Sequence, residues 1–379
     1  MQPSLASPTN PSTGTIHRFA RAVNTPVVKA LRHPWVEHIV RLSAVEDALT
    51  ALHPLLSLTD VRARVVRIVQ ETASTKTFVL QHNALWAGAK AGQFVRVQLE
   101  IDGRRVERAY SLSSRPGARR IAFTVKRQDA GLVSNHLHTA VKVGDVLTIS
   151  QALGEFTLPD ALPAKILLLS AGSGITPVMA MLRDLKARDY RGDVVFLHVC
   201  RTPDDLIFAA QLPALAADFS ALRLELHYDE IAGFFSPQVL AAYVHDVVER
   251  TTWMCGPAGF MDAISAYWDA QGLALPLYSE RFVGAPLLPS AAPGTPVQVA
   301  FENSGARFRT QGTDPLLVQA ERAGLTPKHG CRIGICRSCQ CVKTSGTVEN
   351  LQTGEVSSAP NELIRLCIST ARSDVALAL

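Results

Sequence analysis

The alternation of apolar and polar positions divides the chain into segments that predict different structures. A start rich in Ser, Pro and Thr is followed by helical periodicity in "IHRFARAVNTPVVKALRHPWVEHIVRLS" and "VEDALTALHPLL". From "VRARVVRIVQETASTKTFVLQ" to "VGDVLTISQALGEFTLP", short alternating strands and frequent turn residues are typical of an antiparallel barrel. The stretch "KILLLSAGSGITPVMAMLRDLKARDYRGDVVFLHVC" then runs strand, glycine turn, helix, strand, which predicts a βαβ unit of a parallel sheet.

These patterns predict a multidomain chain of mixed α+β and α/β class. Its 379 residues are too many for one ordinary core. A stretch rich in Pro, Ala and Gly is typical of an interdomain linker. The predicted parts are a helical N-terminal extension over 1–60, an antiparallel barrel over 61–160, a parallel-sheet domain over 161–283, the linker over 284–296, and a cysteine-rich domain over 297–379.

Composition and charge narrow the function classes. A hydrophobic content of 47% is that of a soluble, well-packed protein. The net charge of +5 is small for this length and the basic residues are scattered, so we expect no nucleic acid partner. No apolar run is long enough to span a bilayer, and the N-terminus lacks the apolar core of a signal peptide. We therefore expect a cytoplasmic protein without a transmembrane segment.

The cysteines are concentrated near the end of the chain, where five of the seven fall in the last fifty residues. In a reducing compartment this pattern favours metal over disulfides. Cys331, Cys336 and Cys339 have the spacing C-x4-C-x2-C, and Cys367 follows in "LIRLCIST", as in plant-type [2Fe–2S] centres. Structural zinc is the alternative, although it usually takes a second C-x2-C pair. We expect Cys341 to be a small buried apolar residue and not a ligand.

The segments "CRIGICRSC", "SGTVEN" and "RLCIST" resemble the chloroplast-type ferredoxin domain. The resemblance implies a β-grasp domain at the C-terminus that holds a [2Fe–2S] cluster. A centre of this type carries one electron at low potential, about −400 mV in plant-type ferredoxins. It therefore needs an electron donor.

The segment "RAYSL" resembles the R-x-Y-S motif of the ferredoxin–NADP reductase superfamily. In that family the Arg pairs with the flavin pyrophosphate, the Tyr packs on the isoalloxazine and the Ser hydroxyl lies near flavin N5. The resemblance implies these roles for Arg108, Tyr110 and Ser111. A guanidinium matches phosphate bidentately, and a tyrosine offers a flat apolar face, so the residue types suit the roles. The alternative for Arg108 is a surface salt bridge.

The segment "VKRQDAGLVSNHL" resembles the second flavin element of that family, in which the amides of a helix N-terminus hold the pyrophosphate. "GQFV" and "GEFTLP" match barrel strands of the family, and the four elements follow in the family's order. The resemblance implies an FAD site that includes Val125, Lys126, Gly131, Leu132, Val133 and Ser134.

The segment "SAGSGITPVMAML" resembles the family's GGxGITP loop, with Ala171 in place of the first Gly. Gly172 and Gly174 would let the backbone approach a nicotinamide-dinucleotide pyrophosphate. Thr176 and the helix N-terminus would supply donors. The full G-x-G-x-x-G pattern of a Rossmann fold is absent from the sequence.

The segment "MCGPAGFMDA" resembles the family's C-G-P turn, whose cysteine lies beside the nicotinamide C4. This implies that Cys255 positions the nicotinamide for catalysis together with Ser111, and that Gly256 and Pro257 contact the cofactor. A buried cysteine without a role is the alternative. The resemblance also places Glu280 and Phe282 of "SERF" toward the flavin.

The choice between NADH and NADPH rests on conflicting charges. Arg201, after the strand "VVFLHVC", is placed to reach a 2′-phosphate. Asp229 and Glu230 follow the next strand and would repel that phosphate. These charges favour NADH only slightly.

The resemblance covers residues 61–379 and implies a reductase that passes electrons from NAD(P)H through FAD and a [2Fe–2S] cluster to a separate acceptor. The sequence carries no pattern typical of an oxygen-activating site. A fatty-acyl desaturase is the preferred acceptor, and an alkane, aromatic-ring or steroid hydroxylase is the alternative. A membrane-bound acceptor would hold the chain peripherally at the inner membrane. Rival hypotheses are a flavohaemoprotein-like or quinone-reducing enzyme acting alone, and a redox sensor or interaction protein.

The segment before the barrel has apolar residues at near-helical spacing, interspersed with basic ones. It either packs across the barrel or docks the reductase on a membrane or a membrane-bound acceptor. Pro26 and Pro34 interrupt it, so an autonomous anchor is not expected. Similar extensions precede this domain order in reductases that resemble partners of acyl desaturases. The apolar positions are Ile16, Phe19, Val23, Val27 and Leu31.

Overall fold

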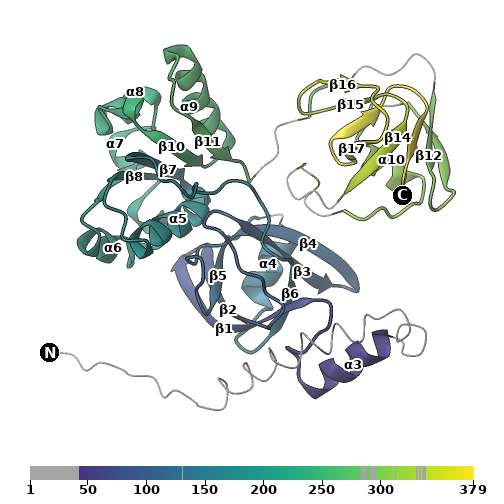
Figure 1. Cartoon of the computed structure of the whole chain (residues 1–379), viewed down its shortest axis with the longest axis horizontal. Helices are drawn as coiled ribbons and strands as arrows, with labels where there is room; N and C mark the ends of the chain where they lie inside the picture. The colour runs from purple at the N-terminus through teal and green to yellow at the C-terminus, as the bar shows by residue number, and fades with distance from the viewer. Residues whose placement is uncertain are drawn as a thin grey trace.

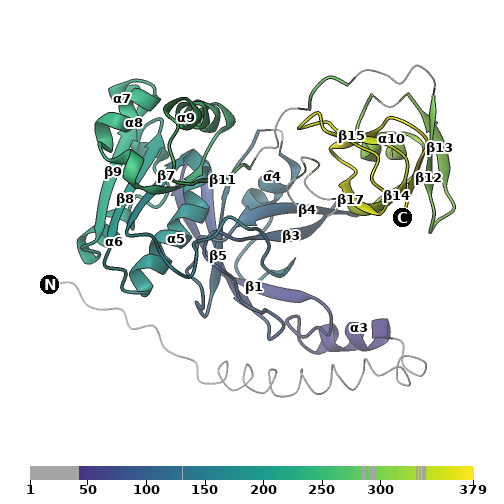
Figure 2. The ribbon, with the colours of Figure 1, turned by 45° about the horizontal axis from the view of Figure 1, so that its top comes forward.

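The structure is a computed structural model that describes residues 42–129, 131–282, 287–290, 296–311, 313–329, 332, 334 and 339–379. It confirms the predicted class, because an antiparallel barrel, a parallel sheet and a small mixed-sheet domain follow one another along the chain (Figure 1). The parallel-sheet domain packs on the barrel, and the C-terminal domain forms a separate lobe (Figure 2). Within the described ranges, no helix has both the length and the apolar character needed to cross a bilayer.

Six antiparallel strands form the barrel in the order β4-β3-β6-β1-β2-β5. A bridge between Leu112 and Phe123 joins the two outer strands and closes it. Alternate residues of each strand point inward, so the period-two pattern of the sequence becomes the barrel core. The elements are β1 (Val61–Thr72), β2 (Thr75–His82), β3 (Phe94–Ile101), β4 (Arg104–Ser111), β5 (Ile121–Lys126), α4 (Leu132–Thr139) and β6 (Val146–Ile149).

Helix α3 (Leu42–Leu52) precedes the barrel and is attached to it by one carboxylate. Glu46 accepts a hydrogen bond from the backbone N of Leu58 at 2.8 Å and lies 3.5 Å from the guanidinium of Arg62 on β1. This helix agrees with the periodicity of "VEDALTALHPLL". The apolar positions predicted between Ile16 and Leu31 lie outside the described residues.

The second domain is a five-stranded parallel sheet in the order β11-β10-β7-β8-β9. Its central strands are buried on both faces, which explains continuous apolar runs such as "KILLLSA". Helices α5 and α6 cover one face, and α8 and α9 cover the other. The elements are β7 (Lys165–Ala171), η1 (Gly172–Gly174), α5 (Ile175–Ala187), β8 (Asp193–Cys200), η2 (Pro203–Asp205), α6 (Leu212–Asp218), β9 (Leu222–Tyr228), α7 (Asp229–Ala232), α8 (Pro237–Tyr243), η3 (Val247–Glu249), β10 (Thr251–Cys255), α9 (Ala258–Gln271) and β11 (Leu277–Glu280).

The barrel and the parallel-sheet domain share a core. Ala91, Phe156 and Leu158, which belong to the barrel region, pack in the same apolar cluster as α5. Gly92 marks the closest approach: a Cβ atom there would lie 2.0 Å from the carbonyl O of Phe156 and 2.6 Å from Cε of Met181 on α5. The two domains therefore meet over a packed apolar contact.

The C-terminal domain has its own core, built around a mixed sheet in the order β13-β12-β19-β14-β17. Strands β12 and β19 pair in parallel, α10 packs on the core, and a second sheet in the order β16-β15-β18 lies beside it. This is the predicted β-grasp arrangement. The elements are β12 (Val297–Phe301), β13 (Arg307–Thr310), α10 (Leu316–Arg322), β14 (Gln340–Ser345), β15 (Val348–Asn350), β16 (Val356–Ser357), β17 (Glu362–Arg365), β18 (Ser369–Ala371) and β19 (Val375–Leu377).

Candidate active site

Three side chains from the two larger domains meet where the barrel touches the parallel sheet. Ser111 ends β4, and its hydroxyl donates to a carboxylate oxygen of Glu280, the last residue of β11, at 3.1 Å. Glu280 is paired across the sheet with Cys255, the last residue of β10. The three residues are far apart in sequence, and the contact exists only because the domains pack together. The sequence motifs containing Ser111 and Cys255 thus converge.

The electrostatics of this junction are set by burial. Loss of water raises the pKa of the Glu280 carboxyl to about 7, and the hydrogen bond from Ser111 opposes the rise. Cys255 is fully buried, which raises the pKa of its thiol well above the usual range, and the nearby Glu280 adds to the rise. Cys255 is therefore a neutral thiol at neutral pH, as a positioning residue requires and a nucleophile does not.

Tyr110 provides an aromatic surface one residue before Ser111. Its ring stacks on Phe123 at 5.3 Å between centroids, and Phe123 stacks on Phe78 at 5.4 Å. Burial raises the pKa of the Tyr110 phenol, with the Arg108 charge acting against it. The tyrosine is therefore held flat by the barrel interior, which fits a ring that supports an isoalloxazine.

The predicted flavin phosphate residues lie at the start of α4 and beside it. Gly131 precedes the helix in a crowded turn: a Cβ atom there would lie 2.5 Å from Oγ of Ser134 and 2.8 Å from Cβ of Gln128. Ser134 is buried, donates to the carbonyl of Gly131 and accepts from the backbone N of Gln128. Its hydroxyl therefore shapes the turn. Val133 is buried, whereas Leu132 and Arg108 are exposed.

The predicted dinucleotide loop has the compact geometry that its glycines require. Gly172 adopts φ +51°, and a Cβ atom on Gly174 would lie 2.1 Å from the carbonyl O of Cys255. This close approach places the N-terminus of α5 directly against the end of β10. Thr176 is buried and its hydroxyl donates to the carbonyl of Ser173 at 3.1 Å, so it holds the loop in shape.

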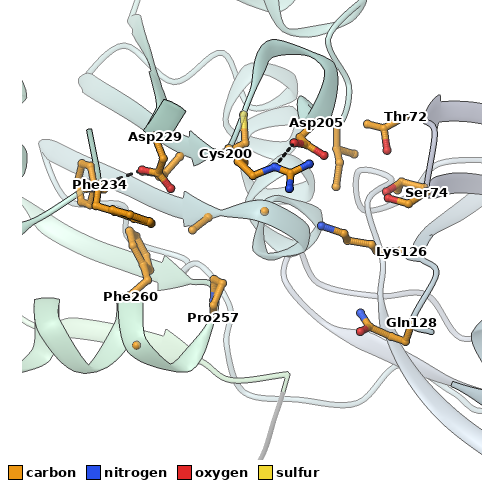
Figure 3. A pocket seen from close by; sticks show the side chains of 18 of the residues that line it. Thr72, Ser74, Lys126, Gln128, Cys200, Asp205, Asp229, Phe234, Pro257 and Phe260 are labelled. Atoms are coloured by element: carbon orange, nitrogen blue, oxygen red, sulfur yellow. Dashed lines mark hydrogen bonds and ion pairs between the residues drawn. The ribbon is translucent and has the colours of Figure 1, made fainter. Parts of the chain in front are cut away.

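A cavity of about 760 Å³ opens between the barrel and the ends of the parallel strands (Figure 3). It is lined by Lys126, Gly172, Arg201 and Pro257 of the predicted site. Its size and its place at the carboxyl ends of parallel strands suit a dinucleotide. It also contains residues that the sequence patterns did not indicate. These are Thr72, Ser74, Gln128, Asp205, Phe234 and Phe260.

Two of these missed residues are aromatic and lie on the parallel-sheet side of the cavity (Figure 3). Phe234 is 88% exposed, which is unusual for its type in a folded domain. Phe260 stands two residues beyond Ala258, at the start of α9, close behind the C-G-P turn. Only the position of Phe260 beside that motif gave a hint in the sequence, since Phe234 lies in an irregular loop.

Arg201 is engaged by two carboxylates at the edge of the cavity. Its Nε lies 3.3 Å from Oδ2 of Asp205 and 3.5 Å from Oε1 of Glu230. Asp229 lies alongside and accepts from the backbone N of Phe235 at 3.1 Å. The positive charge at this position is therefore surrounded by negative charge.

The C-terminal domain brings together the two predicted cluster cysteines that the structure describes. Cys339 and Cys367 are 4% and 3% exposed. The backbone N of Gly334 donates to Sγ of Cys367 at 3.2 Å, and the backbone N of Cys367 donates to Sγ of Cys339 at 3.4 Å. Amides aimed at cysteine sulfurs suit thiolate ligands, so this pair fits a [2Fe–2S] cluster. Cys331 and Cys336 lie outside the described residues.

One further cysteine shares this core with Cys339 and Cys367. Cys341 lies on β14, points into the core of the domain and is 6% exposed. It packs as a small apolar residue in the way expected from the sequence.

Comparisons with known proteins match this organisation. Family models match residues 62–158 (oxidoreductase FAD-binding domain), 168–266 (oxidoreductase NAD-binding domain) and 299–372 (2Fe-2S iron-sulfur cluster binding domain). The chain is 35% identical over 365 residues to an NADPH oxidoreductase of Mycobacterium tuberculosis, covering 93% of this chain and 94% of the relative. It is 31% identical over 345 residues to the glycine betaine monooxygenase reductase subunit of Chromohalobacter salexigens, covering 83% and 94%. The solved structure of phthalate dioxygenase reductase shares the fold, with a TM-score of 0.59 at 23% identity, over 85% of this chain and 98% of that one.

Proposed function

Because the chain belongs to the family of NAD(P)H oxidoreductases that join FAD-binding, NAD-binding and 2Fe-2S domains, we propose that it is the reductase component of an oxygenase system. The observation that carries this proposal is the meeting of Ser111 with Glu280 and Cys255 in a chain that ends in a cluster domain. A monooxygenase reductase subunit with the same domains over 94% of its length supports an oxygenase as the acceptor.

When bound, the flavin takes a hydride from the nicotinamide and passes single electrons on, and the cluster carries each of them toward the acceptor. The chain's own residues supply position and electrostatics. Tyr110 presents a flat face, and Ser111 holds a hydroxyl beside it. Gly174 packs so closely on the carbonyl O of Cys255 that a side chain at this position would clash with it. The buried Cys339 and Cys367 would hold cluster iron, and the spacing of the sequence makes Cys331 and Cys336 the other two ligands of this proposal.

A membrane fatty-acyl desaturase is the finer candidate for the acceptor, and it rests on the N-terminal extension. Helix α3 is attached to the barrel through Glu46, which supports packing for residues 42–52. Residues 1–41 contain the amphipathic stretch and are the candidate docking segment. The two segments therefore need separate tests.

Removing residues 1–41 and keeping α3 tests both the reductase and its acceptor. The full chain should reduce cytochrome c with NAD(P)H at a sustained rate, which a redox sensor would not do. The truncated chain should keep that rate and retain flavin, because Glu46 and its partners remain. Coupled turnover with desaturase-containing membranes should fall at least about tenfold if the segment docks there, as expected for losing a contact of about 1.4 kcal/mol. Unchanged coupled turnover would exclude the docking segment, whereas no coupled turnover with the full chain would leave a non-membrane oxygenase as the acceptor.

We propose that the carboxylates around Arg201 favour NADH over NADPH. A 2′-phosphate entering there would meet Asp205 and Glu230, and a like charge at contact distance costs about 1 kcal/mol even in water. Glu230→Gln should therefore strengthen competitive inhibition by 2′,5′-ADP about fivefold and leave inhibition by 5′-AMP unchanged. Asp204→Asn is the matched control, since Asp204 is exposed next to Asp205 and, among the described residues, forms no ion pair with Arg201. Equal effects of both substitutions would contradict the proposal.

A further inference from the structure

The guanidinium of Arg183, on α5, lies at the junction of the barrel and the parallel-sheet domain. Nη1 donates to the backbone carbonyl of Ser113 in the barrel, and Nη2 donates to the side-chain oxygen of Gln211. The ring of Phe208 lies under the guanidinium, 5.3 Å from Cζ to the ring centroid. Both terminal nitrogens therefore donate to fixed neighbours, one in each domain.

This arrangement is costly for a charge. Burial lowers the pKa of Arg183 to about 10, with the charge of Glu71 acting against the shift. Among the described residues, no carboxylate forms an ion pair with it, and its partners are two neutral oxygens and a ring face. A buried cation without an ionised partner destabilises a fold more than an apolar side chain of the same size. The contribution of Arg183 to this site is therefore its directional hydrogen bonds and not its charge.

Each partner of Arg183 leads to the active site by a short path along the chain. Ser113 comes two residues after Ser111, whose hydroxyl bonds to Glu280. Phe208 and Gln211 close the loop that supplies Asp205 to the cavity wall. Phe208 is buried with φ +64°, a conformation that costs energy for a large side chain. The guanidinium of Arg183 stacks on the ring of Phe208 and so stabilises the loop at its strained residue.

Much of the rest of this junction is apolar, although two other hydrogen bonds cross it, from Ser111 to Glu280 and from Nε1 of Trp253 to the carbonyl of Thr157 at 3.2 Å. Phe156 and Leu158 pack against α5 in the shared core, and Gly92 lets the backbones approach. Apolar contacts hold two domains together but do not fix their relative rotation, because the hydrophobic effect is not directional. The bond from Arg183 to Ser113 adds direction to this junction, and the bond to Gln211 holds the guanidinium in place for it.

We propose that Arg183 is a positioning residue that fixes the rotation of the parallel-sheet domain on the barrel and thereby sets the approach of the nicotinamide to the flavin. The proposal rests on the function assigned to Ser111, Cys255 and Glu280. It adds a structural element, the Arg183 latch, formed by Arg183, Ser113, Phe208 and Gln211. None of these four residues lines the cavity.

Arg183→Met in the full flavin-loaded chain tests the latch, because methionine keeps an unbranched side chain and loses every donor. Amide hydrogen exchange should speed up at residues 111–115 and 205–212 and stay unchanged in the C-terminal domain. In stopped flow, the limiting rate of flavin reduction by NADH should fall about 100-fold, which is the usual effect of misplacing the reacting groups by about 1 Å. The NADH concentration that gives half of the limiting rate should change little. The primary isotope effect with 4-deuterated NADH should become more temperature-dependent.

Two further variants keep the test decisive. Arg183→Lys retains one donor and should recover part of the rate, and it replaces the methionine variant if that one fails to fold. Arg188→Met removes the arginine that directly follows α5 and pairs with Asp184, and it should change nothing in hydride transfer. Faster exchange with an unchanged limiting rate would overturn the positioning role. The hydrogen-exchange measurement needs no nucleotide. It therefore tests whether Arg183 holds the two domains together even if the chain is not a reductase.

Discussion

Replacing Cys367 with serine should remove the [2Fe–2S] absorbance and the bound iron while NAD(P)H still reduces ferricyanide. Cys367 is buried and accepts a hydrogen bond from the amide of Gly334, so its sulfur sits in a site that only a thiolate ligand fills well. The predicted flavin and nicotinamide sites lie in the other two domains, whose apolar clusters contain none of the described residues of the C-terminal core. Electron delivery to cytochrome c should then fall below about one hundredth of the wild-type rate, since the carrier is gone.

Cys341→Ser is the matched control for that experiment. Cys341 lies two residues from Cys339 and is 6% exposed in the same core, but among the described residues no backbone amide donates to its sulfur. Its serine variant should keep two irons per chain and full cytochrome c reduction, at a small cost in stability. Iron analysis and visible spectra of both variants make the comparison. Stoichiometric zinc in the wild-type protein would rule out the cluster altogether.

The second large effect concerns the Ser111–Glu280 pair. Above pH 7 the ionised Glu280 holds the hydroxyl hydrogen of Ser111. Below pH 7 the protonated carboxyl donates to Oγ of Ser111 and frees that hydrogen for the flavin face. We therefore expect flavin reduction by NADH to slow as pH rises through about 7. Ser111→Ala should lower the limiting rate about 100-fold, the usual cost of losing one placed donor, and should abolish the pH step.

Glu280→Gln keeps a hydrogen bond between residue 280 and Ser111 but removes the carboxyl group that titrates. Its amide group donates to Oγ of Ser111 at every pH, so this variant should keep the fast, low-pH rate across pH 6 to about 8.5. Ser279→Ala, at the exposed neighbour of Glu280 on β11, serves as the control and should keep the wild-type pH profile. Stopped-flow absorbance at the flavin band measures all three. A pH step that persisted in Glu280→Gln would assign it to another group.

The fold was predictable because its patterns are local. Period-two strands, the glycine turn before α5 and the apolar run of β7 each specify their element within a few residues. The short strands β15, β16 and β18 have two or three residues, too few for a period to show, and their pairing depends on the C-terminal core.

The site was predictable only where motifs mark it. Ser111, Cys255 and Gly174 were found in this way, and the structure brings them to one junction. Phe234 reaches the cavity from an irregular loop and Asp205 from the short helix η2, and tertiary packing sets the course of both segments. Arg183 resembles any charged residue of an amphipathic helix in sequence, and its role depends on the barrel surface that α5 meets. The raised pKa of Glu280 has the same origin, because burial by the neighbouring domain is not encoded within "SERF".

The shared core of Ala91, Phe156 and Leu158 with α5 has an evolutionary consequence. A recombination breakpoint near residue 160 would cut through one cooperative folding unit and expose apolar surface on both fragments. A breakpoint after β11 would instead separate two units that each keep a complete core. The terminal carrier can therefore be exchanged, lost or moved to the other end of a gene while the hydride chemistry stays intact, so a new electron acceptor can be gained without rebuilding the enzyme.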